Sequence, residues 1–272
     1  LFNVYEGLYK PTSSGDFAPA LAESYAVSED GLQYTFTIRD GVQFHNGTAM
    51  DVDDVVYSFN TCAATTVDSS LAAALSNVVS VDAAAEHTET ITLSAPNSDF
   101  LAYVASVYIV PDDYTDQATA PVGTGPFMYV SRSVQENIIF DKFDGYWGEA
   151  AKVDRVTFKI YEDSSAMMTA LNGGAVDIVT HLTVSQTQNL SDQYTVLEGT
   201  MNLVQALYLN NAQAPFDDVR VRQALCYAID KDAILELTAD GHGAKLGSSV
   251  YPAFTKYFDD SLTDYYTYDP EK

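Results

Sequence analysis

Histidines are the side chains of this 272-residue sequence that could most readily ligate a metal or transfer a proton. They stand at four separate positions, His45, His87, His181 and His242. No two of them are four residues apart and no HExxH sequence occurs, so their spacing predicts no zinc site. His45 lies beside a turn and His87 within a polar turn, which indicates structural or solvated roles. His242 stands between two glycines, in a loop without an evident partner.

Three neighbouring carboxylates, Asp51, Asp53 and Asp54, could bind a divalent cation. An EF-hand loop would also need further oxygen ligands, a central glycine and a closing glutamate at fixed spacing, and these are missing. Carboxylates in the first turn of a helix complement the helix dipole without any metal. We therefore expect Asp51 to cap a helix, and the sequence predicts neither a metal nor a cofactor.

The sequence lacks the motifs of several enzyme classes. No GxSxG nucleophile elbow occurs. Gly123 and Gly125 lack the third glycine of a dinucleotide fingerprint, and Pro126 follows them, which is typical of a rigid turn. An enzyme with two close carboxylates in a cleft is the alternative, but no candidate pair is evident. We expect a protein that is not an enzyme.

Periodic patterns predict the elements that would position these residues. Residues 32–38 alternate between apolar and polar, which is typical of a half-buried strand, and Asn46-Gly47 marks a turn. After Asp51, apolar residues recur with the spacing of a helix at Val52, Val55, Val56 and Phe59. The same reasoning predicts strands at 153–160, 175–179 and 201–209, and helices capped by Ser164 and by Asp217 or Asp218.

Five segments, taken in order, resemble a known family. They are residues 18–59, PVGTGPF at 121–127, FDGYWG at 143–148, ALNGGAVD at 170–177, and 209–230 with its PFDDVRVRQALCYAID. Each segment is weak evidence alone. The ordered set is similar to the extracellular solute-binding proteins of family 5, the peptide, nickel and oligosaccharide receptors of ABC importers.

The resemblance implies an α/β fold of the periplasmic-binding-protein type, a two-lobed clamshell with discontinuous domains. Lobe one would comprise residues 1–15 and 119–203, with an inserted subdomain at 16–118. Residues 204–272 would form the crossover and the start of lobe two. Members of the family are longer, and the sequence shows neither an initiator methionine nor a signal peptide. We therefore expect residues to be missing before Leu1, and most of lobe two to be missing.

The resemblance also implies a function and a site. The protein would capture a small ligand, a peptide first of all, between two lobes and deliver it to a membrane permease. A nickel complex, an oligosaccharide, or a sensor or chaperone role outside transport are the alternatives. The ligand would meet Thr180 and His181 at the mouth of the cleft, and Gln205 and Tyr208 on the crossover strand. The alternative is that each of these side chains is a surface residue or forms its hydrogen bonds within the protein.

Charge and cysteine content complete these expectations. The net charge of −25, from 38 acidic and 13 basic residues, excludes a typical nucleic-acid partner and favours solubility outside the cell. No apolar run approaches the ~20 residues of a membrane helix. The resemblance implies a monomer that is periplasmic or lipid-anchored at the outer face of the cell membrane. Cys62 is expected to end the helix that follows Asp51, and Cys226 to lie in the helix of the RQALCYAID segment. The family places these helices in different domains, so we expect two buried free thiols.

Overall fold

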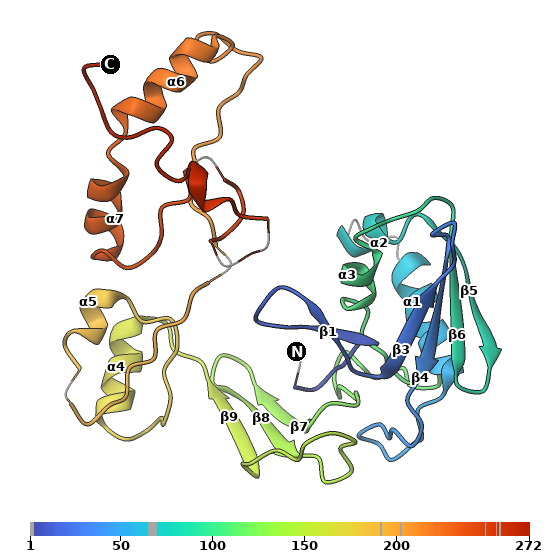
Figure 1. The fold of residues 1–272 in the computed structure, drawn as a ribbon. Helices are drawn as coiled ribbons and strands as arrows, with labels where there is room; N and C mark the ends of the chain where they lie inside the picture. Colours follow the sequence, from blue (N-terminus) through green and yellow to red (C-terminus); the bar gives the residue numbers. More distant parts are fainter. Residues whose placement is uncertain are drawn as a thin grey trace. The chain divides into compact units, whose positions relative to one another are not determined.

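The computed structural model describes residues 3–64, 70–190, 192–201, 203–247, 249–253, 255 and 257–272. Two compact units make up the chain, unit 1 from Leu1 to Glu162 and unit 2 from Asp163 to Lys272 (Figure 1). No helix in the described ranges has the length and apolar character that a membrane crossing needs. The predicted lobe boundaries, at 15/16, 118/119 and 203/204, remain a prediction.

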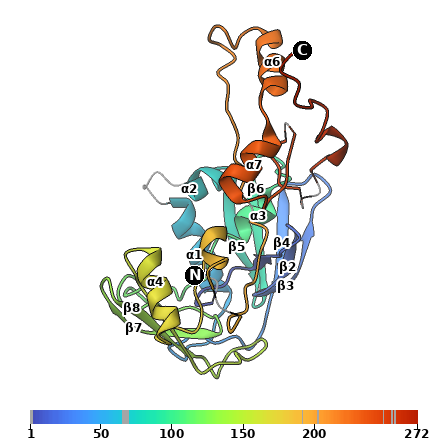
Figure 2. The same cartoon turned by 90° about the vertical axis from the view of Figure 1, so that its left-hand side faces the viewer.

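A four-stranded antiparallel sheet lies at the centre of unit 1, with its strands in the order β3-β4-β6-β5 (Figure 1 and Figure 2). The strands are β3 (Ala22–Val27), β4 (Gln33–Ile38), β5 (Val78–Ala85) and β6 (Thr88–Leu93). In β4, the side chains of Tyr34, Phe36 and Ile38 are buried, while the polar residues between them are exposed or half-buried. The predicted half-buried strand is confirmed.

Helix α1 (Val52–Ala64) contacts β5 and β6 of this sheet. Its first turn is fixed by carboxylates, because Asp51 accepts the backbone N–H groups of Asp53 and Asp54. The carboxylate of Asp54 in turn accepts the N–H groups of Asp51 and Asp112. The structural role predicted for these carboxylates is confirmed. The core of unit 1 includes Phe36, Val55, Phe59, Ile91 and Leu93.

Shorter elements and a second sheet complete unit 1. The short elements are β1 (Tyr9–Pro11), β2 (Phe17–Pro19), α2 (Ser70–Ala74) and α3 (Phe100–Val104). The second sheet is antiparallel, in the order β7-β8-β9, with β7 (Phe127–Ser133), β8 (Asn137–Lys142) and β9 (Arg155–Lys159). Strand β9 confirms the strand predicted within residues 153–160, with a shorter extent.

Unit 2 consists of short helices joined by long irregular segments (Figure 2). The helices are α4 (Ser164–Asn172), α5 (Val184–Thr187), α6 (Val219–Ala228), α7 (Lys231–Ala239) and the 3-10 helix η1 (Asp260–Leu262). The described residues of this unit contain no strand. Only Leu171 and Pro252 among them are buried, so most apolar side chains of unit 2 are not covered within the unit itself.

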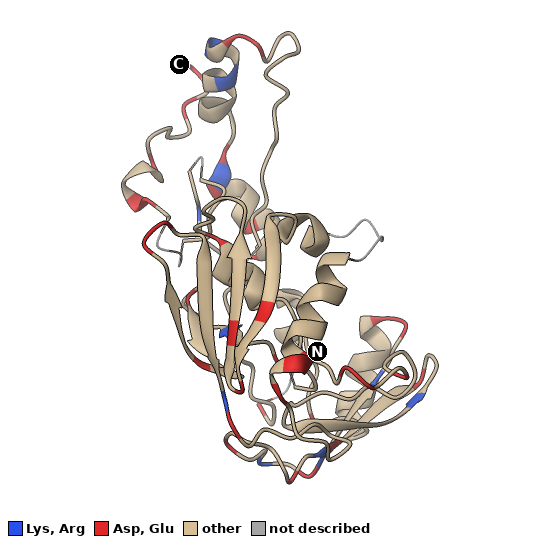
Figure 3. Ribbon diagram, turned by 90° about the vertical axis from the view of Figure 1, so that its right-hand side faces the viewer, with Lys and Arg blue, Asp and Glu red and all other residues tan. Residues whose placement is uncertain are grey.

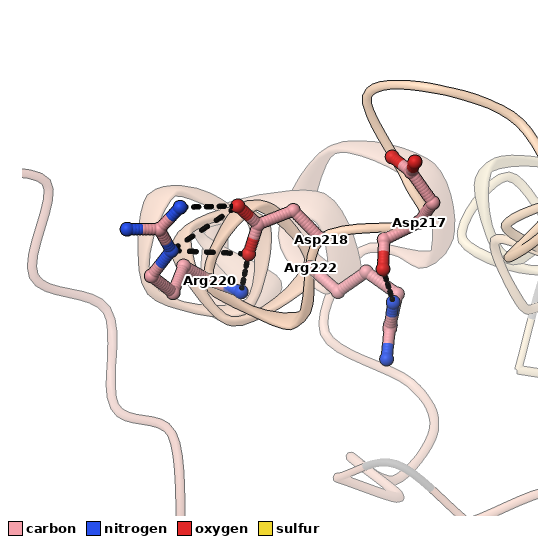
Figure 4. A network of polar contacts seen from close by, with 4 residues as sticks. All are labelled: Asp217, Asp218, Arg220 and Arg222. Carbon is pink, nitrogen blue, oxygen red and sulfur yellow. Dashed lines mark hydrogen bonds and ion pairs between the residues drawn. The ribbon is translucent and has the colours of Figure 1, made fainter.

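Aspartate side chains cap α4, α6, α7 and η1 of unit 2, and Thr183 caps α5. At α6 the carboxylate of Asp218 accepts the N–H of Arg220 at 2.8 Å and also pairs with its guanidinium (Figure 4). Arg222 donates to the backbone oxygens of Phe216 and Asp217, which closes the preceding turn. Asp218 is thus the N-cap of α6, which settles the choice between Asp217 and Asp218 that the sequence left open.

Four local predictions are corrected. Asp163 caps α4 rather than Ser164, which is the first helical residue. Helix α1 continues past Cys62 to Ala64. Both cysteines are free as predicted, but each is half-buried rather than buried. His242 has a partner, since its Nδ1 lies 2.9 Å from a carboxylate oxygen of Glu198.

The two strands predicted in unit 2 are wrong. Residues 175–179 and the described residues of 201–209 lie in no strand, and Asn202 lies outside the described residues. Ile178, Leu203 and Leu207 are exposed instead of buried. Apolar alternation supplies one face of a strand, but a strand also needs a neighbour that takes its main-chain hydrogen bonds, and the described part of unit 2 offers none.

Candidate ligand-binding site and its scaffold

A buried carboxylate in unit 1 ties together segments far apart in the sequence. Glu6 accepts hydrogen bonds from Thr124 Oγ1 at 3.0 Å, Tyr146 Oη at 2.8 Å and Trp147 Nε1 at 2.8 Å. The guanidinium of Arg39 lies 4.3 Å from the centroid of the Trp147 ring, a cation–π arrangement. Burial is the main cause that raises the pKa of Tyr146, with the Glu6 carboxylate second. The polar hydrogens of Thr124, Tyr146 and Trp147 all bond to Glu6 within the protein, so this cluster has a structural role.

The turn at residues 123–125, called the GTG turn, packs directly on the N-terminal segment at Asn3 and Val4. His45 Nδ1 accepts the N–H of Gly123 at 3.2 Å, and His45 Nε2 lies 2.9 Å from the carbonyl oxygen of Gly125. A Cβ at Gly123 would stand 2.1 Å from the carbonyl oxygen of Val4, so only glycine fits there. Burial lowers the pKa of His45 despite its bond to Gly125. The structural role predicted for His45 is confirmed.

Thr180 and His181 lie in unit 2, in the irregular segment between α4 and α5. Both side chains are exposed, and neither residue forms a hydrogen bond, ion pair or ring contact in the described structure. His181 has a φ of 60°, a left-handed conformation that is uncommon outside glycine. Strained backbone positions cluster at functional sites, and the ligand contact of His181 stays a prediction.

Gln205 and Tyr208 lie in segment 203–209, also in unit 2, which belongs to no helix, strand or turn. Their side chains are exposed, that of Tyr208 at 81%. No residue of the segment forms a main-chain hydrogen bond in the described structure. The sequence predicted a buried strand here, but the structure has an irregular, largely exposed segment whose main-chain N–H and C=O groups have no partner among the described residues. No hydrogen bond, ion pair or ring contact joins Gln205 or Tyr208 to Thr180 or His181 in the described structure.

The described part of unit 2 also contains a small cavity, which is too small for a peptide. It has a volume of about 70 Å³, whereas ligand pockets usually measure roughly 300–1,000 Å³. Lys245 lines it and pairs with Asp232 at 2.9 Å and Asp264 at 3.5 Å. The charges at this cavity therefore neutralise one another. In the described ranges no group of three or more His, Cys, Asp or Glu is placed to hold a metal ion.

The ion pair between His242 and Glu198 gives unit 2 a pH-dependent contact. The Glu198 carboxylate, first by its hydrogen bond and then by its charge, raises the pKa of His242. A raised folded-state pKa means that the contact is fully present below the unfolded-state pKa and is lost as pH rises through the folded-state pKa. We expect Glu198→Gln to lower the pKa of His242 in an NMR titration, and Glu29→Gln in unit 1 to leave it unchanged. An unchanged pKa in Glu198→Gln would refute the contact.

Sequence reasoning did not single out Glu6, and it found no partner for His242. A signal for Glu6 did exist, because a tryptophan or tyrosine that is at least half-buried needs an acceptor for its polar hydrogen, and the tyrosine and tryptophan of the YWG stretch are such residues. The partner itself lies 141 residues from Trp147. For Glu198 and His242, 44 residues apart, the sequence carries no signal.

Both units bear an excess of acidic side chains (Figure 3). The red segments are spread over helices, strands and loops, and the blue ones are few. Charge of one sign at this density keeps a protein soluble and repels nucleic acid.

Comparisons with known proteins agree with these features. The model of the "Bacterial extracellular solute-binding proteins, family 5 Middle" matches residues 16–272. Heme-binding protein A of Haemophilus influenzae is 32% identical over 95% of this chain and 53% of its own length. The dipeptide-binding protein of Escherichia coli is 32% identical over 93% of this chain and 53% of its own length. The chain spans about half the length of the curated relatives it matches.

A solved structure extends the likeness to the fold. The periplasmic binding protein DppA of Helicobacter pylori, in complex with the peptide STSA, superposes with a TM-score of 0.82. It is 27% identical over 98% of this chain and 58% of its own chain. The fold is therefore α/β and part of the two-lobed periplasmic-binding-protein class, as predicted, and the relatives are solute-binding proteins rather than enzymes. The chain belongs to the bacterial extracellular solute-binding proteins of family 5.

Proposed function

We propose that this chain is part of a substrate-binding receptor of a bacterial ABC importer, and that its ligand is a peptide. The receptor would act outside the cytoplasmic membrane as a monomer and pass the ligand to a membrane permease. One observation carries the peptide assignment: segment 203–209 lies in no helix, strand or turn, and its main-chain groups have no partner in the described structure.

An extended peptide satisfies such a segment directly. Peptides bind exposed strand edges by adding a strand, so that main-chain hydrogen bonds give affinity and side chains give specificity. Side chains alternate along an extended segment. Gln205 and Tyr208 would therefore project to opposite faces, where an amide and a phenol ring could contact different parts of the ligand. Thr180 and His181 would add further polar contacts.

The relatives support a peptide as the ligand, and their names also indicate which other ligands have to be tested. One is a dipeptide-binding protein, and a solved neighbour holds the peptide STSA. Others are named for heme, glutathione and nickel. Glutathione is itself a tripeptide, and so it shares the main-chain chemistry on which this proposal rests. Heme and a nickel complex do not pair with a strand edge, and the ligand test has to include both.

Side-chain removal tests the site. We expect His181→Ala and Gln205→Ala each to weaken binding of the peptide Ser-Thr-Ser-Ala about 3- to 10-fold, because each removes one hydrogen bond worth roughly 0.5–1.5 kcal/mol. Isothermal titration calorimetry on the protein at its natural length gives the dissociation constants. The exposed Glu29→Ala in unit 1 is the control. Wild-type affinity in both site variants would remove these residues from the site.

A pair of proline substitutions tests the main-chain pairing. Only alternate N–H groups of a strand face the same neighbour, and proline removes one N–H. We therefore expect only one of the two substitutions, Ala206→Pro or Leu207→Pro, to weaken the binding of Ser-Thr-Ser-Ala strongly. Equal loss in both would indicate a general distortion, and no loss in either would contradict strand addition.

A further inference from the structure

Strand β6 carries a carboxyl group on the face of the sheet that points into the core. Glu89 is in phase with Ile91 and Leu93, and all three side chains are buried. Across the ladder, Glu89 pairs with Phe36 of β4, which is also buried. Because alternate residues of a strand share a face, Glu89 occupies a position where an apolar side chain would be expected.

Neither carboxyl oxygen of Glu89 has a hydrogen-bond partner, and the residue is 0% exposed. Glu6 shows the contrast, since three donors satisfy its carboxylate. An ionised carboxylate without partners in an apolar environment costs far more free energy than a neutral carboxyl. Burial accordingly raises the pKa of Glu89 to about 8 from an ordinary value of 4.5.

The strands beside β6 provide no compensating charge. On β4 the buried phenol of Tyr34 donates its hydrogen bond to the backbone oxygen of Asn97 at 3.0 Å. On β5 the carboxylate of Asp82 is exposed. Glu86 and His87, in the turn before β6, are exposed as well. The groups beside Glu89 along the sheet are thus apolar, already paired, or exposed to solvent.

Helix α1, which packs on β6, provides none either. The carboxylate of Asp54 is buried, but it accepts two backbone N–H groups at the start of the helix. Cys62 is a half-buried thiol whose pKa is raised by burial. Asp53 and Tyr57 are exposed. No lysine, arginine or histidine of the described chain bonds to Glu89.

We propose that Glu89 is a proton-operated latch of unit 1. With its proton bound, the carboxyl group is neutral and α1 packs closed over β5 and β6. Without the proton, a charge without partners lies in the core, and the contact between α1 and the sheet has to open to admit water or a cation. Unit 1 is therefore a domain whose packing responds to pH above neutrality.

The direction of the effect follows from linkage. Between its ordinary pKa of 4.5 and its folded-state pKa of about 8, the folded protein holds a proton at Glu89 that the unfolded chain has released. The stability that this proton contributes is fully present below the lower value, declines as pH rises through the window, and levels off above the upper value. The unfolding equilibrium constant should rise about tenfold per pH unit within the window.

Glu89→Gln tests the latch, because glutamine keeps the shape of the side chain and does not titrate. Urea unfolding of wild type, Glu89→Gln and the exposed control Glu29→Gln is measured from pH 5 to 9. We expect the ratio of the unfolding constants, wild type over Glu89→Gln, to grow about tenfold per pH unit up to pH 8 and then to level. The control should follow the wild type. Parallel pH profiles of wild type and Glu89→Gln would overturn the proposal.

A second measurement does not depend on any variant folding. Carbon-13 NMR of the wild-type protein follows the titration of the Glu89 carboxyl carbon directly. The latch predicts a midpoint near pH 8 together with changed shifts in α1 over the same range. A midpoint near 4.5, or a titration that leaves α1 unchanged, would contradict it.

Discussion

Replacing Gly123 with alanine is expected to destabilise unit 1 by about 3 kcal/mol or more. The new Cβ would stand 2.1 Å from the carbonyl oxygen of Val4, and that atom belongs to the backbone, so no side-chain rotation relieves the clash. The turn cannot move away freely, because the Gly123 N–H donates to His45 Nδ1 and its carbonyl oxygen accepts the His45 N–H. Urea unfolding, followed by the fluorescence of the single tryptophan, measures the loss.

Gly199→Ala is the matched control for this substitution. A Cβ at Gly199 would meet no atom within 4 Å, so the change in unfolding free energy should remain within about 0.5 kcal/mol. A Gly123→Ala protein with the wild-type unfolding midpoint would show that the GTG turn does not lie against the N-terminal segment.

Glu6→Ala is expected to cost about 3–5 kcal/mol, because it leaves the polar hydrogens of Thr124, Tyr146 and Trp147 without an acceptor. Each buried donor without a partner costs roughly 1–3 kcal/mol, and partial access of water reduces the sum. The emission of Trp147 should also shift, because its indole N–H would lose its bond to the protein. Urea unfolding and the emission spectrum measure the two effects.

Two further variants separate the hydrogen bonds from the charge. Glu6→Gln keeps one acceptor oxygen and should lose less stability than Glu6→Ala. Glu29→Ala removes an exposed carboxylate and should leave both stability and emission unchanged. If Glu6→Ala and Glu29→Ala behaved alike, the carboxylate of Glu6 would not hold the segments of unit 1 together.

Local patterns predicted the centre of unit 1 well. Strand β4 follows from alternation, and the first turn of α1 from Asp51 and the helical spacing after it, because neighbouring residues decide both. Side-chain partners far along the chain were beyond this reasoning. The bond between Glu6 and Trp147 spans 141 residues, and a linear pattern has no information on which distant segments meet.

Unit 2 shows the opposite case, in which local patterns misled. The apolar residues around Ile178 and Leu207 predicted buried strands, and both side chains are exposed. Burial depends on what covers a segment, and the described part of unit 2 has almost nothing that does. For the proposed site, sequence reasoning supplied residue types that suit hydrogen bonding to a ligand, Thr180, His181, Gln205 and Tyr208. It did not predict that the main-chain groups of segment 203–209 have no partner in the described structure.

The central proposal, a receptor for peptides, is tested most directly by native mass spectrometry of the protein at its natural length. The protein is incubated first with equal amounts of Ser-Thr-Ser-Ala, glutathione, heme and a nickel–histidine complex, and then with heme and the nickel complex in excess. The proposal predicts an adduct of peptide mass in both mixtures. An adduct of heme or of the nickel complex alone, or a protein that retains no small molecule, would contradict it.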